Sequence, residues 1–442
     1  MKRFRLVWIW TLFLKLLLSA VIPLTTDETY YWVWSQHPQL SYYDHPPFVA
    51  WLLWLGHLFE PFGHAVRWPA VLLGHCTLLI WFLIWQLLYE DSSEEKKFSW
   101  WLGLALCSPL IGFGSLIITP DVPVIFFWST SLYFFLRVFR FHHLRDYILL
   151  GASLGLGFCS KYHIVLFLPF VLAYLLMERQ WKAVRWKYVL ATIFFGLLFS
   201  SPVLIWNVMN DFASFRFQMR HGLVRPQYKF YWTWSYVLAQ IFVLFPTVFF
   251  TALRARVPGL SRILIYFAWG PLLFFFLSSF KALVEVNWPA VAYPAFFVLA
   301  VLGAKRAWPL WAANIFWLSL FVILGSHAWK PWIPSAPDKL SEFTQFQPLL
   351  KKREQYKPVY ASTYQMASWI WYETKQPLYK LHGMSRFDLF DSFAEGQPTG
   401  YPIYVMMKRY TEMPPWIEKD PQYHVSEVES LENDFVIVKI DK

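Results

Sequence analysis

Long apolar stretches separated by short polar segments run along most of the chain. A stretch of about 20 apolar residues is long enough to cross the hydrocarbon core of a bilayer as an α-helix. The pattern predicts eleven spans, at residues 6–24, 69–89, 99–117, 122–139, 147–160, 162–177, 188–206, 232–252, 263–279, 289–304 and 308–327. The fifth and sixth are short, because the segment 147–177 is interrupted by glycines and by Ser160-Lys161.

The basic residues between these stretches predict how the chain crosses the membrane. With a cytoplasmic N-terminus, the inner loops hold Lys96-Lys97, Arg140 to Arg145, Arg179 to Lys187, Arg254 to Arg262 and Lys305-Arg306. This is the distribution that the positive-inside rule describes. A single crossing at 147–177 would invert every later loop against the rule, so two short crossings are predicted there. Residues after about Lys330 then lie outside.

The polarity of the chain changes near residue 330. Residues 331–442 are polar and rich in proline, with short runs typical of strands and one run typical of a helix. The strand-like runs are Lys357–Ser362, Pro377–Leu381, Pro402–Met406 and Asp434–Ile440, and the helix-like run is Tyr364–Tyr372. We therefore predict a membrane domain at 1–330 and a small periplasmic α/β domain at 331–442.

Composition and charge exclude several classes of protein. Hydrophobic residues make up 57% of the 442 positions and charged residues only 15%, against about 25% charged in ordinary soluble proteins. The net charge of +11 does not indicate a nucleic-acid-binding protein, because the basic residues are dispersed in short clusters between apolar runs. The three cysteines have no zinc-site spacing. Residues 6–24 are predicted to be a first span rather than a cleaved signal, because no small-residue cleavage site precedes Asp27.

Three outer segments carry the unusual polar chemistry. These are the loop 25–66, the turn 119–123 and the loop 207–231. The first two hold four candidate acids: Asp27, Glu28, Asp44 and Asp121. An acid near membrane depth is costly and is by default a functional candidate. For Asp121 the alternative stays open that it only stabilises the N-terminus of the following helix.

A sugar-transfer centre uses these residue types. A carboxylate takes the proton of the acceptor as the bond to the anomeric carbon forms. A phosphate leaving group needs positive charge, which Arg and Lys supply. Lys161 lies between two short spans, and Arg216 and Arg220 are four residues apart, which places both on one helix face.

Several motifs together resemble one enzyme family. Asp27-Glu28-Thr29-Tyr30-Tyr31-Trp32 and Tyr43-Asp44-His45-Pro46-Pro47 closely resemble the first outer loop of GT-C membrane glycosyltransferases of the family 39/83 type. This family includes protein O-mannosyltransferases and the aminoarabinose transferases that modify lipid A. Similar motifs follow in the same order: Thr119-Pro120-Asp121, Ser160-Lys161-Tyr162, Trp206-Asn207, Ser214-Phe215-Arg216-Phe217-Gln218 and Glu285-Val286-Asn287-Trp288-Pro289-Ala290.

The resemblance implies roles for individual residues. Asp27 matches the first-loop aspartate regarded as the catalytic base or its partner, and Asp121 matches the second family aspartate. Glu28 is grouped with these two as catalytic. In the aminoarabinose enzymes the position of Asp44 helps to hold a metal, and a Lys that helps to bind phosphate occupies the position of His45. The substrate-binding residues are expected to be Lys161, Arg216, Arg220, His45, Tyr43 and Glu285, with Asp44 and His45 as metal ligands if a divalent metal is used.

The family donor is a monosaccharide on a polyprenyl phosphate such as undecaprenyl phosphate. We therefore expect a bacterial inner-membrane glycosyltransferase that acts on a periplasmic acceptor, either lipid A, another envelope glycolipid or a protein. A required cofactor is not predicted, and no nucleotide-sugar site is visible in the sequence. A transporter or flippase of lipid-linked saccharide is the alternative from another class. It is disfavoured because the polar groups gather at the outer face rather than at the midplane.

Overall fold

The computed structural model describes residues 2–89, 95–223, 227–330, 332–333 and 342–442. The chain divides into two compact units, each of which is built from two separate stretches of sequence. The first unit comprises Met1–Val21 and Leu40–Ile323, and the second comprises Ile22–Gln39 and Leu324–Lys442. The sequence predicts a boundary between residues 330 and 331, which assigns residues 22–39 to the membrane domain. In the structure these residues belong to the second unit.

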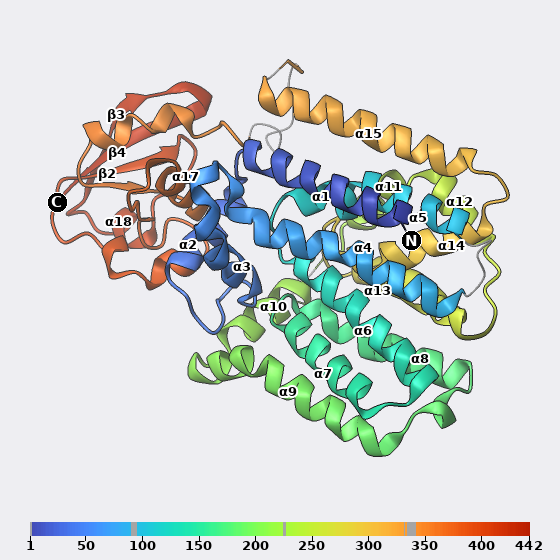
Figure 1. The fold of residues 1–442 in the computed structure, drawn as a ribbon. Coiled ribbons are helices and arrows are strands. Elements are labelled where there is room, and N and C mark those ends of the chain that lie inside the picture. Colours follow the sequence, from blue (N-terminus) through green and yellow to red (C-terminus); the bar gives the residue numbers. More distant parts are fainter. Residues whose placement is uncertain (1, 90–94, 224–226, 331, 334–341) are drawn as a thin grey trace. The chain divides into compact units, whose positions relative to one another are not determined.

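The first unit is almost entirely helical (Figure 1). Its α-helices are α1 (Lys2–Val21), α3 (Phe48–Gly56), α4 (Trp68–Leu88), α5 (Glu95–Cys107), α6 (Asp121–Phe141), α7 (Leu144–Phe158), α8 (Phe167–Met177), α9 (Trp186–Met209), α10 (Ala213–Leu223), α11 (Phe230–Leu244), α12 (Pro246–Leu253), α13 (Ile263–Ser278) and α14 (Tyr293–Gly303). Helix α15 (Trp308–Trp329) begins in this unit. Short 3₁₀ or π turns extend several of them: η1 (His57–Phe62), η2 (Ala65–Arg67), η4 (Pro109–Phe113), η5 (Gly114–Leu116), η6 (Tyr162–Leu166), η8 (Gly259–Arg262) and η9 (Trp288–Ala292).

The helices are consistent with a multi-pass membrane protein. Among the described residues, six helices are individually long and apolar enough to cross a membrane, or eight if each of two sharply bent pairs is one span. The bent pairs are α5 with η4 and η5, at 65°, and α11 with α12, at 89°. All eleven predicted stretches are helical. Three of them, at α7, η6–α8 and η9–α14, form helical segments of fewer than 18 residues, which is shorter than a full membrane span. The mainly helical fold class is confirmed, and the count of eleven stays a prediction.

Small residues allow two of the helices to approach closely. Helix α4 packs against α6, α6 against α7, and α7 against α9 (Figure 1). A Cβ atom added at Gly151 would lie 2.3 Å from the backbone oxygen of Thr192, and one at Gly155 would lie 2.6 Å from that of Gly196. Glycine at these positions therefore lets the backbones of α7 and α9 meet, as in other membrane helix pairs.

The second unit is the predicted small α/β domain. It contains α2 (Thr26–Gln36), α16 (Lys352–Gln355), β1 (Val359–Ala361), α17 (Tyr364–Thr374), η12 (Leu389–Ser392), β2 (Ile403–Lys408), α18 (Pro415–Glu418), β3 (His424–Ser430) and β4 (Phe435–Asp441). The strand order is β1-β2-β4-β3, with β1 parallel to β2 and the other pairs antiparallel. Apolar residues of β2 and β4 form a buried cluster on one face of the sheet, among them Ile403, Val405, Val436 and Val438.

The predicted strands and helix of this unit are largely confirmed. Three of the four strand-like runs overlap β1, β2 and β4, and the helix-like run lies within α17. The prediction for Pro377–Leu381 was wrong, since this run makes only an isolated bridge from Lys380 to Ala361. Strand β3 was missed, because its sequence alternates valine with glutamate and serine on an exposed edge and carries no apolar run.

Helix α2 completes the second unit. It packs against α17, where the Thr29 and Ser368 hydroxyl oxygens lie 3.2 Å apart. The ring of Tyr30 lies 4.4 Å from that of Tyr364, and its hydroxyl accepts a hydrogen bond from the Leu389 backbone N–H at 2.9 Å. Residues that the sequence places before the second span thus form part of the core of the C-terminal unit.

A buried lysine holds the segment between β1 and β2 together. The Lys380 Nζ donates to Asp388 Oδ2 at 2.5 Å, to Asp391 Oδ2 at 2.6 Å and to the Arg386 carbonyl at 3.0 Å. The side chains of Lys380 and Asp388 have no exposed surface. Burial raises the pKa of Asp388 to about 6, an effect that the charge of Lys380 offsets only in part.

We expect Lys380→Ala to destabilise the second unit by about 3–5 kcal/mol, because it leaves two buried carboxylates without their cation. Lys357→Ala is the matched control, since Lys357 forms an exposed ion pair with Glu354, which contributes little to stability because solvent screens it. Hydrogen exchange of α17 and β2 in the full chain measures both effects. Equal protection in the two variants would contradict the prediction.

The stability of the second unit should also depend on pH through Asp388. Its pKa is higher in the folded chain, about 6, than the ordinary value of 3.8, so the folded state binds the proton more tightly. Stability should therefore fall as the pH rises from about 4 to about 6, by roughly 3 kcal/mol at most. Protection factors of residues 380–391, measured at both ends of this range, should show the fall, and Asp388→Asn should flatten it.

Candidate functional site

A buried ion pair links three distant segments of the first unit. The Lys161 Nζ donates to Asp121 Oδ1 at 2.7 Å, and the Asn287 Nδ2 donates to Asp121 Oδ2 at 2.6 Å. The side chains of Lys161 and Asp121 are 9% and 13% exposed. Both carboxylate oxygens of Asp121 are therefore engaged, one by a cation and one by an amide.

Local sequence places each of the three residues at a break in a helix. Asp121 is the first residue of α6 and follows Pro120, where the helix dipole favours a negative charge. Lys161 follows the end of α7, and its N–H donates to the Gly157 carbonyl at 3.0 Å. Asn287 directly precedes η9, whose second residue is Pro289. A charged or amide side chain at such a break leaves the apolar helix interiors undisturbed.

The loop that carries Asp44 and His45 is fixed beside Lys161. The Phe48 N–H donates to the Cys159 carbonyl at 3.0 Å, two residues before Lys161. On the other side, the Gln218 Nε2 of α10 donates to the Asp44 carbonyl at 2.6 Å. The Asp44 side chain is buried. The sequence-predicted residues Asp44, His45, Asp121 and Lys161 therefore belong to one connected region.

Helix α10 contributes further contacts to this region. The Tyr162 hydroxyl lies 2.9 Å from the Ser214 hydroxyl, and the ring of Tyr43 lies 4.8 Å from that of Phe217. Arg216 lies on this helix and is exposed. The backbone of Arg220 is in the same helix, but its side chain lies outside the described residues. Contacts of either arginine with substrate stay a prediction.

His163 also belongs to this region and was missed from the sequence. Its ring lies 5.1 Å from that of Phe275 and 5.5 Å from that of Trp288. Its Nδ1 is buried and, within the described chain, has no hydrogen-bond partner. Electrostatic interactions couple it to Lys161 and His45. A histidine two residues after a candidate lysine is the signal that would have found it.

Asn287 is the second residue that sequence reasoning did not single out. The sequence motif Glu285–Ala290 predicts Glu285 as its site residue. Glu285 is exposed, and its carbonyl accepts from the Trp288 N–H at 3.1 Å. The side chain that reaches Asp121 is that of Asn287, whose position just before a Trp-Pro pair is the available signal.

Lys15 is a further buried lysine of the first unit. Its Nζ donates to the Ser115 hydroxyl at 2.6 Å, and Ser115 lies in η5 on the segment that leads to Asp121. A lysine inside an apolar helix is costly unless it has such a partner. This contact fixes α1 to the bent segment before α6.

Asp27 and Glu28 lie in the second unit. The Glu28 side chain is buried and accepts from the Thr25 N–H at 2.9 Å, while the Thr25 hydroxyl accepts from the Glu28 N–H at 3.2 Å. This is the reciprocal capping box that begins many helices. Asp27 is exposed in the first turn of α2. The capping contact gives Glu28 a structural role.

The metal prediction for Asp44 and His45 stays a prediction. Within the described ranges, no group of three or more His, Cys, Asp and Glu side chains is placed to hold an ion.

The sequence is similar to membrane glycosyltransferases. Residues 44–206 match the family model of dolichyl-phosphate-mannose-protein mannosyltransferases. Over 304 residues the chain is 25% identical to lipid A galacturonosyltransferase RgtD of Rhizobium johnstonii, covering 64% of this chain and 61% of that protein. Over 208 residues it is 26% identical to the lipopolysaccharide core galacturonosyltransferase RgtA of the same organism, covering 46% and 41%. The similarity thus spans less than two thirds of either relative.

The fold is similar to solved structures along nearly the whole chain. ArnT from Cupriavidus metallidurans bound to undecaprenyl phosphate matches with a TM-score of 0.68 and 12% identity, covering 99% of this chain and 98% of that one. The apo structure of the same protein gives a TM-score of 0.69 and 13% identity over the same shares. The predicted resemblance is confirmed: the chain is a multi-pass membrane protein with the GT-C fold, resembling protein mannosyltransferases and ArnT.

Proposed function

We propose that this protein transfers a monosaccharide from undecaprenyl phosphate to a glycolipid of the bacterial cell envelope, such as lipid A or its core sugars. Two sequence relatives are named for transfer to lipid A and to the lipopolysaccharide core. The structural neighbour was solved with undecaprenyl phosphate. In the predicted topology, the N-terminus is cytoplasmic and the C-terminal unit is periplasmic, so that transfer takes place at the outer face of the inner membrane.

The observation that carries this proposal is the buried Lys161 ammonium held by Asp121. An ammonium has three N–H donors, and Asp121 takes one of them. The others are assigned to the phosphate of the donor. Because Asp121 is engaged at both oxygens, we assign it to orienting Lys161 rather than to proton transfer.

The reaction then proceeds by displacement at the anomeric carbon. The acceptor hydroxyl oxygen attacks this carbon as the bond to the phosphate oxygen breaks, and the electron pair of that bond stays on the prenyl phosphate. Lys161 stabilises the negative charge that grows on the departing phosphate, an effect that is strong where water is excluded. The proton of the acceptor passes to a carboxylate, which we assign to Asp27 because the Glu28 carboxylate caps a helix.

The remaining predicted residues are assigned to substrate binding. His45 and Tyr43 lie on the loop fixed beside Lys161, and Arg216 and Arg220 lie on α10. The sugar and acceptor phosphate groups offer partners for these side chains. Glu285, which is exposed, is assigned to contact with the acceptor.

A protein acceptor is the second candidate, since the matching family model is that of protein mannosyltransferases. The purified protein, supplied with an undecaprenyl-phosphate sugar, should glycosylate lipid A or lipopolysaccharide core in preference to a Ser/Thr-containing protein. Transfer to the protein alone would favour the second candidate. Protein-dependent movement of the lipid-linked sugar across vesicles without any transfer would favour a flippase.

Substitutions of the ion pair should separate its chemical role from its structural role. Asp121→Ala should destabilise the first unit by about 3–5 kcal/mol, because it leaves Lys161 buried without its anion. The double variant Asp121→Leu with Lys161→Met should regain much of this stability, yet transfer should fall by about 10²–10³-fold. Thermal unfolding and initial transfer rates in detergent measure the two effects. Lys281→Met, an exposed lysine, is the control, and full activity in the double variant would contradict the role of Lys161.

Asp27→Asn should lower the transfer rate by about 10²–10⁴-fold, the usual contribution of a positioned general base. Its side chain is exposed, so the unfolding temperature should be unchanged. Glu412→Gln, another exposed acid of the second unit, is the control and should keep its activity. An active Asp27→Asn variant would move the base to another carboxylate.

A further inference from the structure

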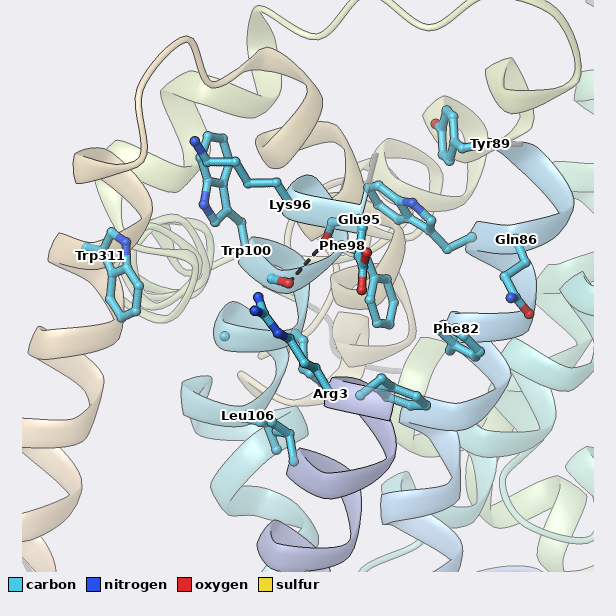
Figure 2. A pocket seen from close by; sticks show the side chains of 16 residues that line it. Arg3, Phe82, Gln86, Tyr89, Glu95, Lys96, Phe98, Trp100, Leu106 and Trp311 are labelled. Carbon is cyan, nitrogen blue, oxygen red and sulfur yellow. Dashed lines mark hydrogen bonds between the residues drawn. The ribbon is translucent and has the colours of Figure 1, made fainter. Parts of the chain in front are cut away.

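A large cavity lies in the first unit where α1 begins and α4 ends (Figure 2). Its volume is about 1120 Å³, above the usual range of about 300–1,000 Å³ for small-molecule sites. Residues of α1, α4 and α5 line it, together with Trp311 of α15. The proposed transfer reaction makes no use of it.

This cavity is far from the Lys161 region. The Arg140 side chain, at the last turn of α6, donates to the Leu87 carbonyl at the end of α4 at 2.8 Å. The ends of α4 and α6 therefore meet on the side of the cavity. Asp121 starts α6 and lies 20 residues before Phe141, so the helix separates the two sites by about 30 Å.

The cavity wall is rich in aromatic rings. Its apolar lining residues include Phe4, Phe82, Trp85, Phe98, Trp100, Leu106 and Trp311. On the flanking helices, Leu6 and Trp10 of α1 are 59% and 67% exposed, and Trp311 of α15 is 56% exposed. Exposed apolar side chains of membrane helices face lipid. The walls and surroundings of the cavity therefore match the hydrocarbon chains of a lipid.

The polar groups of the cavity favour an anion. Figure 2 shows Arg3 extending from α1 toward α5, which carries Glu95 and Lys96. The Lys96 Nζ also lies 5.6 Å from the ring centre of Trp100. Arg3, Lys96 and Glu95 line the cavity. Their net charge of +1 matches the single negative charge of a phosphodiester. A terminal phosphate monoester carries more charge, about −1.5 to −2 at pH 7.

We propose that this cavity binds one anionic phospholipid of the bilayer. Its phosphodiester lies between Arg3 and Lys96, and its acyl chains lie along the aromatic wall. The cations anchor the headgroup by charge-assisted hydrogen bonds, and the rings bury the chains. The site is thus a second lipid site, separated by the length of α6 from the site proposed for the polyprenyl-phosphate donor.

Native mass spectrometry of the full chain in detergent tests this proposal, with phosphatidylglycerol, phosphatidylcholine and undecaprenyl phosphate added separately. One phosphatidylglycerol should remain bound at a concentration where phosphatidylcholine does not. Arg3→Ala with Lys96→Ala should weaken its binding by about 30-fold, from about 1 kcal/mol for each cation. The matched control is Arg5→Ala with Lys97→Ala, which removes two neighbouring cations that do not line the cavity and should change the binding little.

A second variant tests the cavity independently of charge. Ser99 lines the cavity and is exposed, so Ser99→Trp should fill it without burying a polar group and should abolish retention of phosphatidylglycerol, whereas Ser99→Ala should not. Equal binding of the two phospholipids would overturn the proposal, as would unchanged binding in both cavity variants. Retention of undecaprenyl phosphate in place of phosphatidylglycerol would overturn the assignment to a phosphodiester lipid.

Discussion

The ion pair between Asp121 and Lys161 is the constraint on which the first unit depends. A charge inside an apolar helical unit is costly unless a partner of opposite charge and further hydrogen bonds accompany it. Here the partner comes from the turn after α7, and Asn287 supplies the additional bond. Three segments that are up to 166 residues apart in the sequence must therefore meet at one point, and the helices that carry them are positioned accordingly.

The meeting of Asp121, Lys161 and Asn287 also explains why the helices around them are short or interrupted. Lys161 and Asn287 each lie between helices, where the chain is not confined to one helical direction. The bent segment before Asp121 is held by the buried contact between Lys15 and Ser115. Irregular backbone at this depth is tolerated where protein rather than lipid surrounds it. Rigid support from several sides keeps the polar side chains in place before any substrate arrives.

Much of this architecture follows from the amino-acid pattern. The apolar runs predict most helices of the first unit, although not α3 and α10, and the runs Pro402–Met406 and Asp434–Ile440 predict two adjacent strands of the sheet. The ion-pair partners Asp121 and Lys161 were both candidates, because charged residues at membrane depth are conspicuous. Asn287, His163 and Lys15 were not chosen, because their importance arises from contacts with residues far away in the sequence. Periodicity reports only on neighbours along one helix or strand, so it could not indicate that α2 belongs with the C-terminal sheet.

The two-part origin of the second unit has a consequence for its biosynthesis. Helix α2 leaves the ribosome near the beginning of translation, whereas α17, against which it packs, is made more than 300 residues later. The aromatic face of α2, with Tyr30 and Trp34 buried in the finished protein, has no such cover during that interval. A fragment that starts at residue 331 would lack α2 and would therefore leave the apolar face of α17 exposed. The two ends of the polypeptide are thus obliged to mature as one assembly, and neither is a self-sufficient module.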